Sequence, residues 1–150
     1  MQVETKTKTE DVLRKFIDAY NAHDLTSIAV TLAPDVEMLT PATPLYAPRG
    51  VKGKQAVTAA FQMVFNMAPD VHDTLSIVIA SGRTVAFELV ETGTLKGPIQ
   101  LPTRTIPPTN RRYETPWAGF LTVNEEGLIT KMNFYYDLLG WLSQVGVKPE

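Results

Sequence analysis

From His72 onward, the dominant hydrophobic period of the chain changes from helical to extended, and this change constrains the fold more than any other feature. Before it, apolar residues recur at three- and four-residue spacing, which is typical of amphipathic helices. After it, apolar and β-branched runs flank tight turns, which is typical of antiparallel hairpins. A chain with helices first and hairpins afterwards is predicted to be α+β, with its helices on one face of a curved antiparallel sheet.

The first half of the chain contains the helical segments. An apolar stripe from Val12 to Tyr20 ends at the polar segment 21–24, and Asp24 is a suitable N-cap for the helix that follows. Pro34 is expected to stop that second helix, and the third is expected to end near Pro69. In chain order we expect helices over residues 12–20, 24–32 and 56–65, a strand over 36–40 and a loop over 41–53.

The second half contains the extended segments and one last helix. The first hairpin is predicted over residues 75–90, the second over 113–136, and the helix over 138–145. The segment 96–110 contains Pro98, Pro102, Pro107 and Pro108. It is therefore predicted to be a long loop over a sheet edge or a pocket mouth, because proline cannot donate to an interior ladder.

Bulk properties predict one domain and exclude several partners. The 150 residues are 44% hydrophobic, which suits a single core over residues 1–150, with the polar segment 1–9 expected to be flexible. The net charge of -2 gives little attraction for nucleic acid or for an anionic membrane. The chain has no Cys and no apolar leader, so a cytoplasmic location is expected.

Asp137 is the first candidate for chemistry, because the strand-like run from Leu128 ends there and passes directly into an apolar helix. A carboxylate in an apolar cavity has a raised pKa and can act as a general acid or base. An Asp at this position is equally suited to cap the helix. If it points inward, alternation places Asn133 and Tyr135 in the same cavity. The opposite face would then carry Met132, Phe134 and Tyr136.

Other side chains could line a ligand pocket. His72, at a strand start, could exchange a proton or serve only as a hydrogen-bonded structural residue. Amphipathic rings and one further acid are predicted to contact substrate: Tyr20, Tyr46, Glu91, Tyr113 and Trp117. The histidines and carboxylates lack metal-ligand spacing, and no glycine-rich nucleotide motif is present, so neither a metal nor another cofactor is predicted.

Three segments resemble the SnoaL-like polyketide or ester cyclases of the nuclear transport factor 2-like superfamily. They are 16–25 (Phe-Ile-Asp-Ala-Tyr-Asn-Ala-His-Asp-Leu), 32–37 (Leu-Ala-Pro-Asp-Val-Glu), and Asp137 together with the segment 141–146. The resemblance implies a cone-shaped α+β barrel, with N-terminal helices wrapping the sheet into a cup. It also implies Asp137 as acid-base in a cofactor-independent, aldol-type cyclisation or an isomerisation. The substrate would be a polyketide-like or other hydrophobic carbonyl compound, and the protein a homodimer packed through the sheet.

Relatives with the same cup differ in chemistry, so the fold does not decide the reaction. Ketosteroid isomerases are similar, but their catalytic groups would fall on Phe16, Thr40 and Ala118. Limonene epoxide hydrolases would have their arginine at Leu89, where this chain has no cation. A relative of either kind with altered residues remains an alternative, as do a non-catalytic binder of a hydrophobic molecule and a structural dimerisation module.

Overall fold

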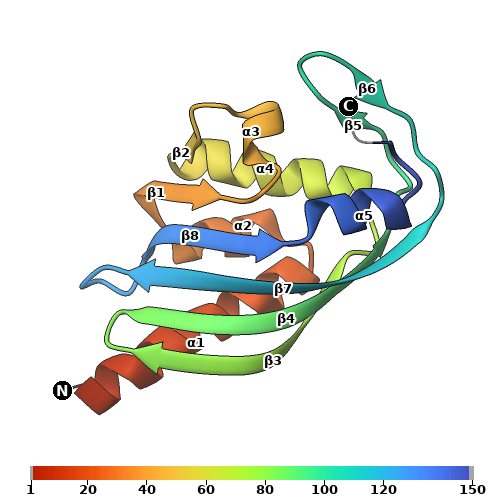
Figure 1. The fold of residues 1–150 in the computed structure, drawn as a ribbon. Coiled ribbons are helices and arrows are strands. Elements are labelled where there is room, and N and C mark those ends of the chain that lie inside the picture. Colours follow the sequence, from red (N-terminus) through yellow and green to blue (C-terminus); the bar gives the residue numbers. More distant parts are fainter. Residues whose placement is uncertain (1, 149–150) are drawn as a thin grey trace.

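The computed structural model describes residues 2–148 of the chain, with side chains described from residue 8. Helices lie on one side of a curved sheet and leave its other side uncovered (Figure 1). The helix α1 packs on β3 and β4, and α4 packs on β1. The described helices are α1 (Gln2–Asn21), α2 (Leu25–Thr31), α3 (Thr43–Tyr46), α4 (Lys54–Met67) and α5 (Leu138–Gln144).

The main sheet has six strands in the order β2-β1-β8-β7-β4-β3, and a separate pair is formed by β5 and β6. The strands are β1 (Leu32–Leu39), β2 (Val51–Lys52), β3 (His72–Ser81), β4 (Thr84–Thr94), β5 (Ile99–Gln100), β6 (Thr105–Ile106), β7 (Arg112–Val123) and β8 (Ile129–Tyr136). The sheet curves around the helices without closing, since β2 and β3 remain its two edges. The predicted α+β class and curved sheet are confirmed.

One pair of strands departs from the antiparallel prediction. β1 and β8 are parallel, whereas every other neighbouring pair in the main sheet is antiparallel. No tight turn joins β1 to β8, because most of the chain lies between them, so their relative direction is set by the path of the whole domain. Both predicted hairpins are present, as β3–β4 and β7–β8.

Several boundaries also differ from the sequence prediction. The second helix ends at Thr31, and β1 begins at once and runs through Pro34. Proline is tolerated there because the pairing of β1 with β8 is irregular between Leu32 and Glu37. The predicted loop 41–53 contains α3 and β2, and the proline-rich loop 96–110 contains the short β5–β6 hairpin.

The core lies between the inner face of the sheet and the helices. Leu13 and Phe16 of α1 are buried together with Leu89, Leu121 and Met132, which come from β4, β7 and β8. Between residues 2 and 148, no helix is long and apolar enough to cross a membrane. The flexibility of residues 1–9 stays a prediction: residues 2–9 belong to α1, and Met1 lies outside the described residues.

Candidate active site

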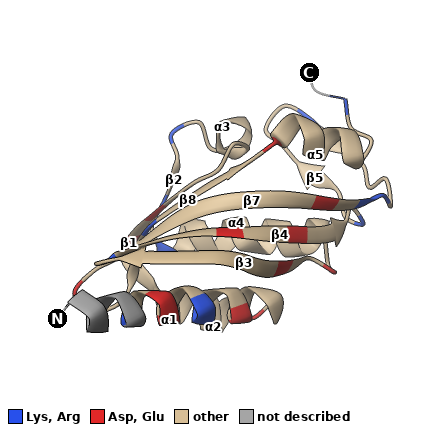
Figure 2. Ribbon diagram, turned by 60° about the horizontal axis from the view of Figure 1, so that its bottom comes forward, with Lys and Arg blue, Asp and Glu red and all other residues tan. Residues whose placement is uncertain are grey.

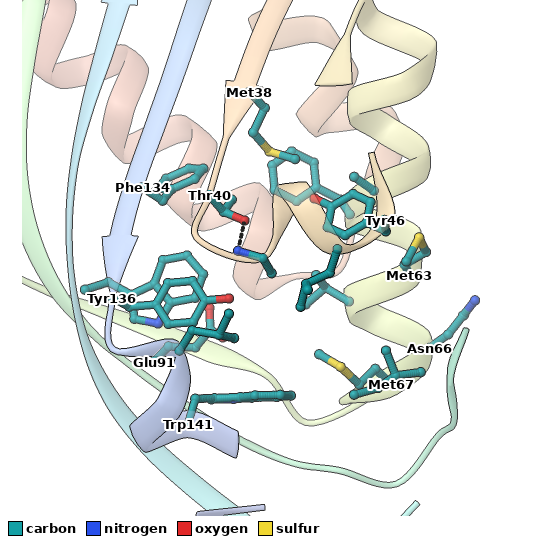
Figure 3. Close-up of a pocket in the computed structure, with 18 of the residues that line it drawn as sticks. Met38, Thr40, Tyr46, Met63, Asn66, Met67, Glu91, Phe134, Tyr136 and Trp141 are labelled. Carbon is teal, nitrogen blue, oxygen red and sulfur yellow. Dashed lines mark hydrogen bonds between the residues drawn. The ribbon is translucent and has the colours of Figure 1, made fainter. Parts of the chain in front are cut away.

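A cavity of about 220 Å³ opens within the cup. Strands β1, β3, β4, β7 and β8 contribute one wall, and α1, α3, α4, α5 and the β5–β6 hairpin lie around the rest of the cavity. In Figure 3, Glu91 and Tyr136 lie on the sheet side of the cavity, whereas Met63 and Met67 of α4 lie opposite. The lining is predominantly apolar and includes no Lys, Arg or His among the described residues. This volume is below the ~300 Å³ that is usual for small-molecule sites.

Two carboxyl groups, Asp73 and Glu91, line this apolar cavity. Asp73 lies on β3 and Glu91 on β4, directly opposite each other in the register of the two strands. Their residues are only 7% and 4% exposed. Opposite residues of an antiparallel pair point to the same face of the sheet, which brings both carboxyl groups together on its inner side.

Two phenols hold Glu91 from different elements. The Tyr20 hydroxyl of α1 donates to Oε2 at 3.0 Å, and the Tyr113 hydroxyl of β7 donates to Oε1 at 3.1 Å. Both bonds are buried. Hydrogen bonds of this kind favour the ionised form of a carboxyl group, so Glu91 is the better stabilised anion of the pair.

Burial dominates the electrostatics of the pair. It raises the pKa of Asp73 well above its usual value, and the neighbouring Glu91 charge and a hydrogen bond to Glu91 raise it further. Burial also raises the pKa of Glu91, although hydrogen bonds from Asp73, Tyr20 and Tyr113 oppose this effect. No described group donates to Oδ1 of Asp73. The two acids are therefore best described as a pair that shares one proton, carried mainly by Asp73.

Aromatic rings form the wall next to the acid pair. Trp117 and Tyr136 stack with ring centroids 4.1 Å apart, and Phe134 meets Trp117 edge to face. The indole nitrogen of Trp117 is buried and has no hydrogen-bond partner among the described residues. Burial also raises the pKa of the Tyr136 hydroxyl, so this group stays neutral and can donate a hydrogen bond. Flat rings and a few polar atoms suit an apolar ligand that carries oxygen atoms.

Comparison with known families identifies the family of this domain. The sequence model described as the SnoaL-like domain matches residues 13–132. The chain belongs to the SnoaL-like domain family. No curated protein matches the chain.

Solved structures agree with the assignment to the SnoaL-like family. A candidate SnoaL-like polyketide cyclase from Jannaschia sp. CCS1 has a TM-score of 0.81 at 19% identity, with 97% of this chain and 96% of that chain covered. IdmH, a candidate polyketide cyclase from Streptomyces antibioticus, has a TM-score of 0.74 at 25% identity, over 93% and 99% of the two chains. A candidate polyketide cyclase from Xanthomonas campestris pv. campestris has a TM-score of 0.75 at 24% identity, over 94% and 98%.

The structure of this SnoaL-like domain shows where the residues predicted to contact substrate lie. Tyr20, Tyr46, Glu91 and Trp117 all line the cavity. Tyr113 is buried and acts on the cavity through its bond to Glu91.

The orientation predicted for Asp137 is wrong. Its side chain is exposed, and Oδ1 accepts a hydrogen bond from the Gly140 backbone at 2.8 Å as the N-cap of α5. Asn133 and Tyr135 also face away from the cavity, whereas Phe134 and Tyr136 line it. The physical reason is that the opposite face of β8 points inward. The prediction placed Met132 and Phe134 on the outer face, but they pack into the core.

His72 is exposed, and its ring lies 3.5 Å from the Thr74 hydroxyl, outside the cavity lining. The neighbouring residue, Asp73, points inward in its place. Sequence reasoning missed Asp73, although the signal was available: Val71, Asp73 and Leu75 share one face of the strand. That the face is the inner one follows only from the packing of α1 on β3.

The arrangement suits proton transfer in a water-poor site. Within residues 2–148, no three or more His, Cys, Asp or Glu side chains are grouped so that they could hold a metal ion. The acid pair offers one site that can accept a proton and one that can donate it, next to an apolar space where a ligand can lie. Such a pair can therefore serve both halves of a reaction that removes and returns one proton.

Proposed function

We propose that this SnoaL-like protein is a cofactor-independent enzyme that transfers protons on a hydrophobic carbonyl substrate, with Asp73 and Glu91 as its acid-base pair. The observation that carries the proposal is the buried carboxyl pair in an otherwise apolar cavity. The cyclase descriptions of the related structures support an aldol-type cyclisation, with isomerisation as the second possible outcome. This assignment replaces Asp137 with Asp73 as the proton carrier.

The proposed mechanism needs one proton and no external reagent. The ionised member of the pair removes a proton from the carbon next to a substrate carbonyl, and this leaves an enolate. In cyclisation, the enolate carbon attacks a second carbonyl of the same molecule, and the pair returns the proton to the new alkoxide. In isomerisation, the proton returns to a different carbon. The cavity walls hold the chain folded and exclude water, which favours both outcomes.

An exchange assay tests the acid-base step before the natural substrate is known. Hydrophobic 1,3-dicarbonyl compounds are incubated with the protein in D₂O, and loss of the α-proton is followed by NMR. We expect Asp73→Asn and Glu91→Gln to lower the exchange rate by about a hundredfold or more. Glu88→Gln is the matched control, because Glu88 is an exposed acid on the same strand.

Asp137→Asn belongs in the same experiment. If this variant loses exchange while the Asp73 and Glu91 variants keep it, the assignment to the buried pair is wrong.

A non-catalytic binding role is the second candidate. The exposure of Asp137, the residue that matches the family's acid-base aspartate, favours it. Both oxygens of the Glu91 carboxylate also accept hydrogen bonds from phenols, which is the arrangement that a purely structural role would require. A binder would hold the same compounds in calorimetry, quench Trp117 fluorescence, and show no exchange above the rate in buffer.

We also propose a homodimer, packed through the uncovered face of the sheet. The sequence predicted that the dimer packs through the face of Met132, Phe134 and Tyr136. That face points inward, so a different set of residues must form the contact. Large apolar side chains are exposed on the outer face of β3, β7 and β8, and Figure 2 shows few charged positions along these strands. The set consists of Ile77, Ile79, Phe120 and Tyr135.

These residues lie on one patch of the outer face, which also contains the exposed Glu88 opposite Ile77. Ala86 is paired with Ile79 on one side and with Phe120 on the other, which joins β3, β4 and β7. The rings of Phe120 and Tyr135 meet edge to face at 6.3 Å, which extends the patch to β8. An exposed apolar patch of this kind suits a twofold contact between two copies, in which each residue set meets itself.

Sedimentation velocity tests the dimer. We expect the wild type to sediment as a dimer at micromolar concentration and Phe120→Glu to sediment as a monomer. Val30→Glu is the matched control, because Val30 is 69% exposed on α2, away from the sheet. A monomeric wild type would refute the proposal.

A further inference from the structure

The C-terminal end of α1 contacts both members of the acid pair through consecutive residues. Tyr20 donates its hydroxyl to the Glu91 side chain at 3.0 Å. The next residue, Asn21, binds the backbone of Asp73 twice: its Nδ2 donates to the Asp73 carbonyl at 2.8 Å, and its Oδ1 accepts from the Asp73 N–H at 2.7 Å. One end of one helix therefore holds the side chain of one acid and the backbone of the other.

The two bonds to Asn21 matter because β3 is an edge strand of the sheet. Its outward-facing N–H and C=O groups have no neighbouring strand, and at residue 73 the Asn21 amide takes the place of one. An unpartnered strand edge would hydrogen-bond to water and fray more easily. The Asn21 side chain thus fixes the β3 backbone at the residue that carries the buried acid.

The same bonds define how Asp73 meets Glu91. Both polar backbone groups of Asp73 are directed at Asn21, so they are directed away from Glu91 on β4. Asp73 and Glu91 are therefore a non-hydrogen-bonded cross-strand pair, the type in which opposite Cα atoms are closest, at about 4.5 Å. This geometry brings their side chains closer together than the alternative pair type would.

We propose that Asn21 is a positioning residue for the acid pair: by holding the edge-strand backbone, it sets the Asp73 carboxyl group against Glu91. The inference rests on the proposed function, in which this pair transfers the proton. Asn21 does not line the cavity and acts only through Asp73. Tyr20 completes the arrangement from the preceding position.

The titration of the pair depends on the groups that face it from each packed element. Tyr20 of α1 and Tyr113 of β7 donate hydrogen bonds to Glu91. Burial raises the pKa of Tyr136 on β8, and the charge of Glu91 raises it further. All three phenols have raised pKa values, caused first by burial, so they stay neutral through the range in which carboxyl groups titrate. Changes in that range therefore report on Asp73 and Glu91.

His23 supplies a matched control from the same turn. Its Nε2 donates to the Val71 carbonyl at 2.8 Å, two residues before Asp73 on the same stretch of chain. His23 has a φ of 55°, so the replacement is Asn, which tolerates this region of backbone space. His23→Asn thus removes a comparable bond between the turn and this segment without touching residue 73.

The test is a titration of ¹³C-labelled carboxyl groups by NMR, performed without any substrate. We expect Asn21→Ala to weaken the proton affinity of Asp73 about tenfold or more, because the freed edge admits water to the carboxyl group. His23→Asn should change this affinity less than about twofold at a similar loss of stability. If Asn21→Ala does not fold, Asn21→Ser is measured instead. Serine can keep one bond to the Asp73 backbone but cannot bridge both groups, so we expect a smaller decrease in the proton affinity of Asp73.

Two outcomes overturn the inference: an unchanged Asp73 titration in the folded Asn21 variant, or equal changes in the Asn21 and His23 variants. Because the measurement needs no turnover, it is independent of the exchange assay. Failure of the exchange assay alone would remove the catalytic role and leave the positioning result standing. If exchange is observed, the acid limb of its pH profile should move in Asn21→Ala in step with the titration and stay unchanged in His23→Asn.

Discussion

Asp73→Asn should flatten the dependence of folding stability on pH. Burial raises the pKa of Asp73 in the folded state, whereas in the unfolded chain an Asp titrates near its ordinary value of about 3.9. The stability that comes from this group is fully present below the unfolded pKa. It is lost as the pH rises through the folded pKa, because the unfolded chain releases its proton first. Asparagine resembles the protonated acid in shape and has no such titration.

The magnitude follows from counting protons. Between the unfolded and folded pKa values, the folded protein holds one proton on Asp73 that the unfolded chain has released. This changes the free energy of unfolding by about 1.4 kcal/mol for each pH unit. Glu91, whose pKa is also raised, contributes in the same direction and is present in both proteins. An unpaired amide in the variant lowers the free energy of unfolding by the same amount at every pH. It therefore shifts the curve of this free energy against pH without changing its slope.

Urea unfolding at half-unit steps from pH 4.5 to 8 provides the measurement. The free energy of unfolding of Asp73→Asn minus that of the wild type should rise by about 1.4 kcal/mol per pH unit from the acid end, until it reaches a plateau at the folded pKa. Groups outside the pair are common to both proteins, so their contributions cancel in this difference. Parallel curves over the whole range would show that Asp73 titrates normally, and the argument for a shared proton would then fail.

Three further substitutions test the surroundings of the pair. Tyr113→Phe removes one of the two phenol bonds to Glu91 and should cost about 1.5–3 kcal/mol by urea unfolding, the usual value for a bond to a charged group; a loss below about 0.5 kcal/mol would mean that Glu91 is not ionised. A Cβ at residue 93 would lie 2.6 Å from the Tyr113 hydroxyl, so Gly93→Ala should displace that hydroxyl, destabilise the protein by about 1–3 kcal/mol and shift the Glu91 carboxyl resonance; an unshifted resonance would contradict this. Asp137→Ala should lower stability by about 1 kcal/mol through loss of the α5 cap and leave α-proton exchange intact; lost exchange at full stability would restore Asp137 as the acid-base residue.

The sequence by itself determined the local elements of this protein. The change of period near His72 separates helices from hairpins, and turn residues such as Gly82 and Gly127, both at positive φ, mark where the hairpins reverse. Tyr20 and Trp117 could be assigned to a pocket because amphipathic rings require a partner when they are buried. These features depend on neighbours along the chain, so a single sequence carries them.

The tertiary structure decided which face of each strand points inward. Alternation states only that Phe134 and Tyr135 lie on opposite faces, and because β8 carries apolar groups on both, its pattern could not choose between them. Helix packing and the parallel contact with β1 made that choice and moved Asp137 to the outside. In β3, the pairing is irregular between Leu75 and Ile77, so the residues that face inward change from Asp73 and Leu75 to Val78 and Ala80. The acid pair itself exists only where β3 meets β4, because the burial that raises both pKa values is a property of the assembled cup.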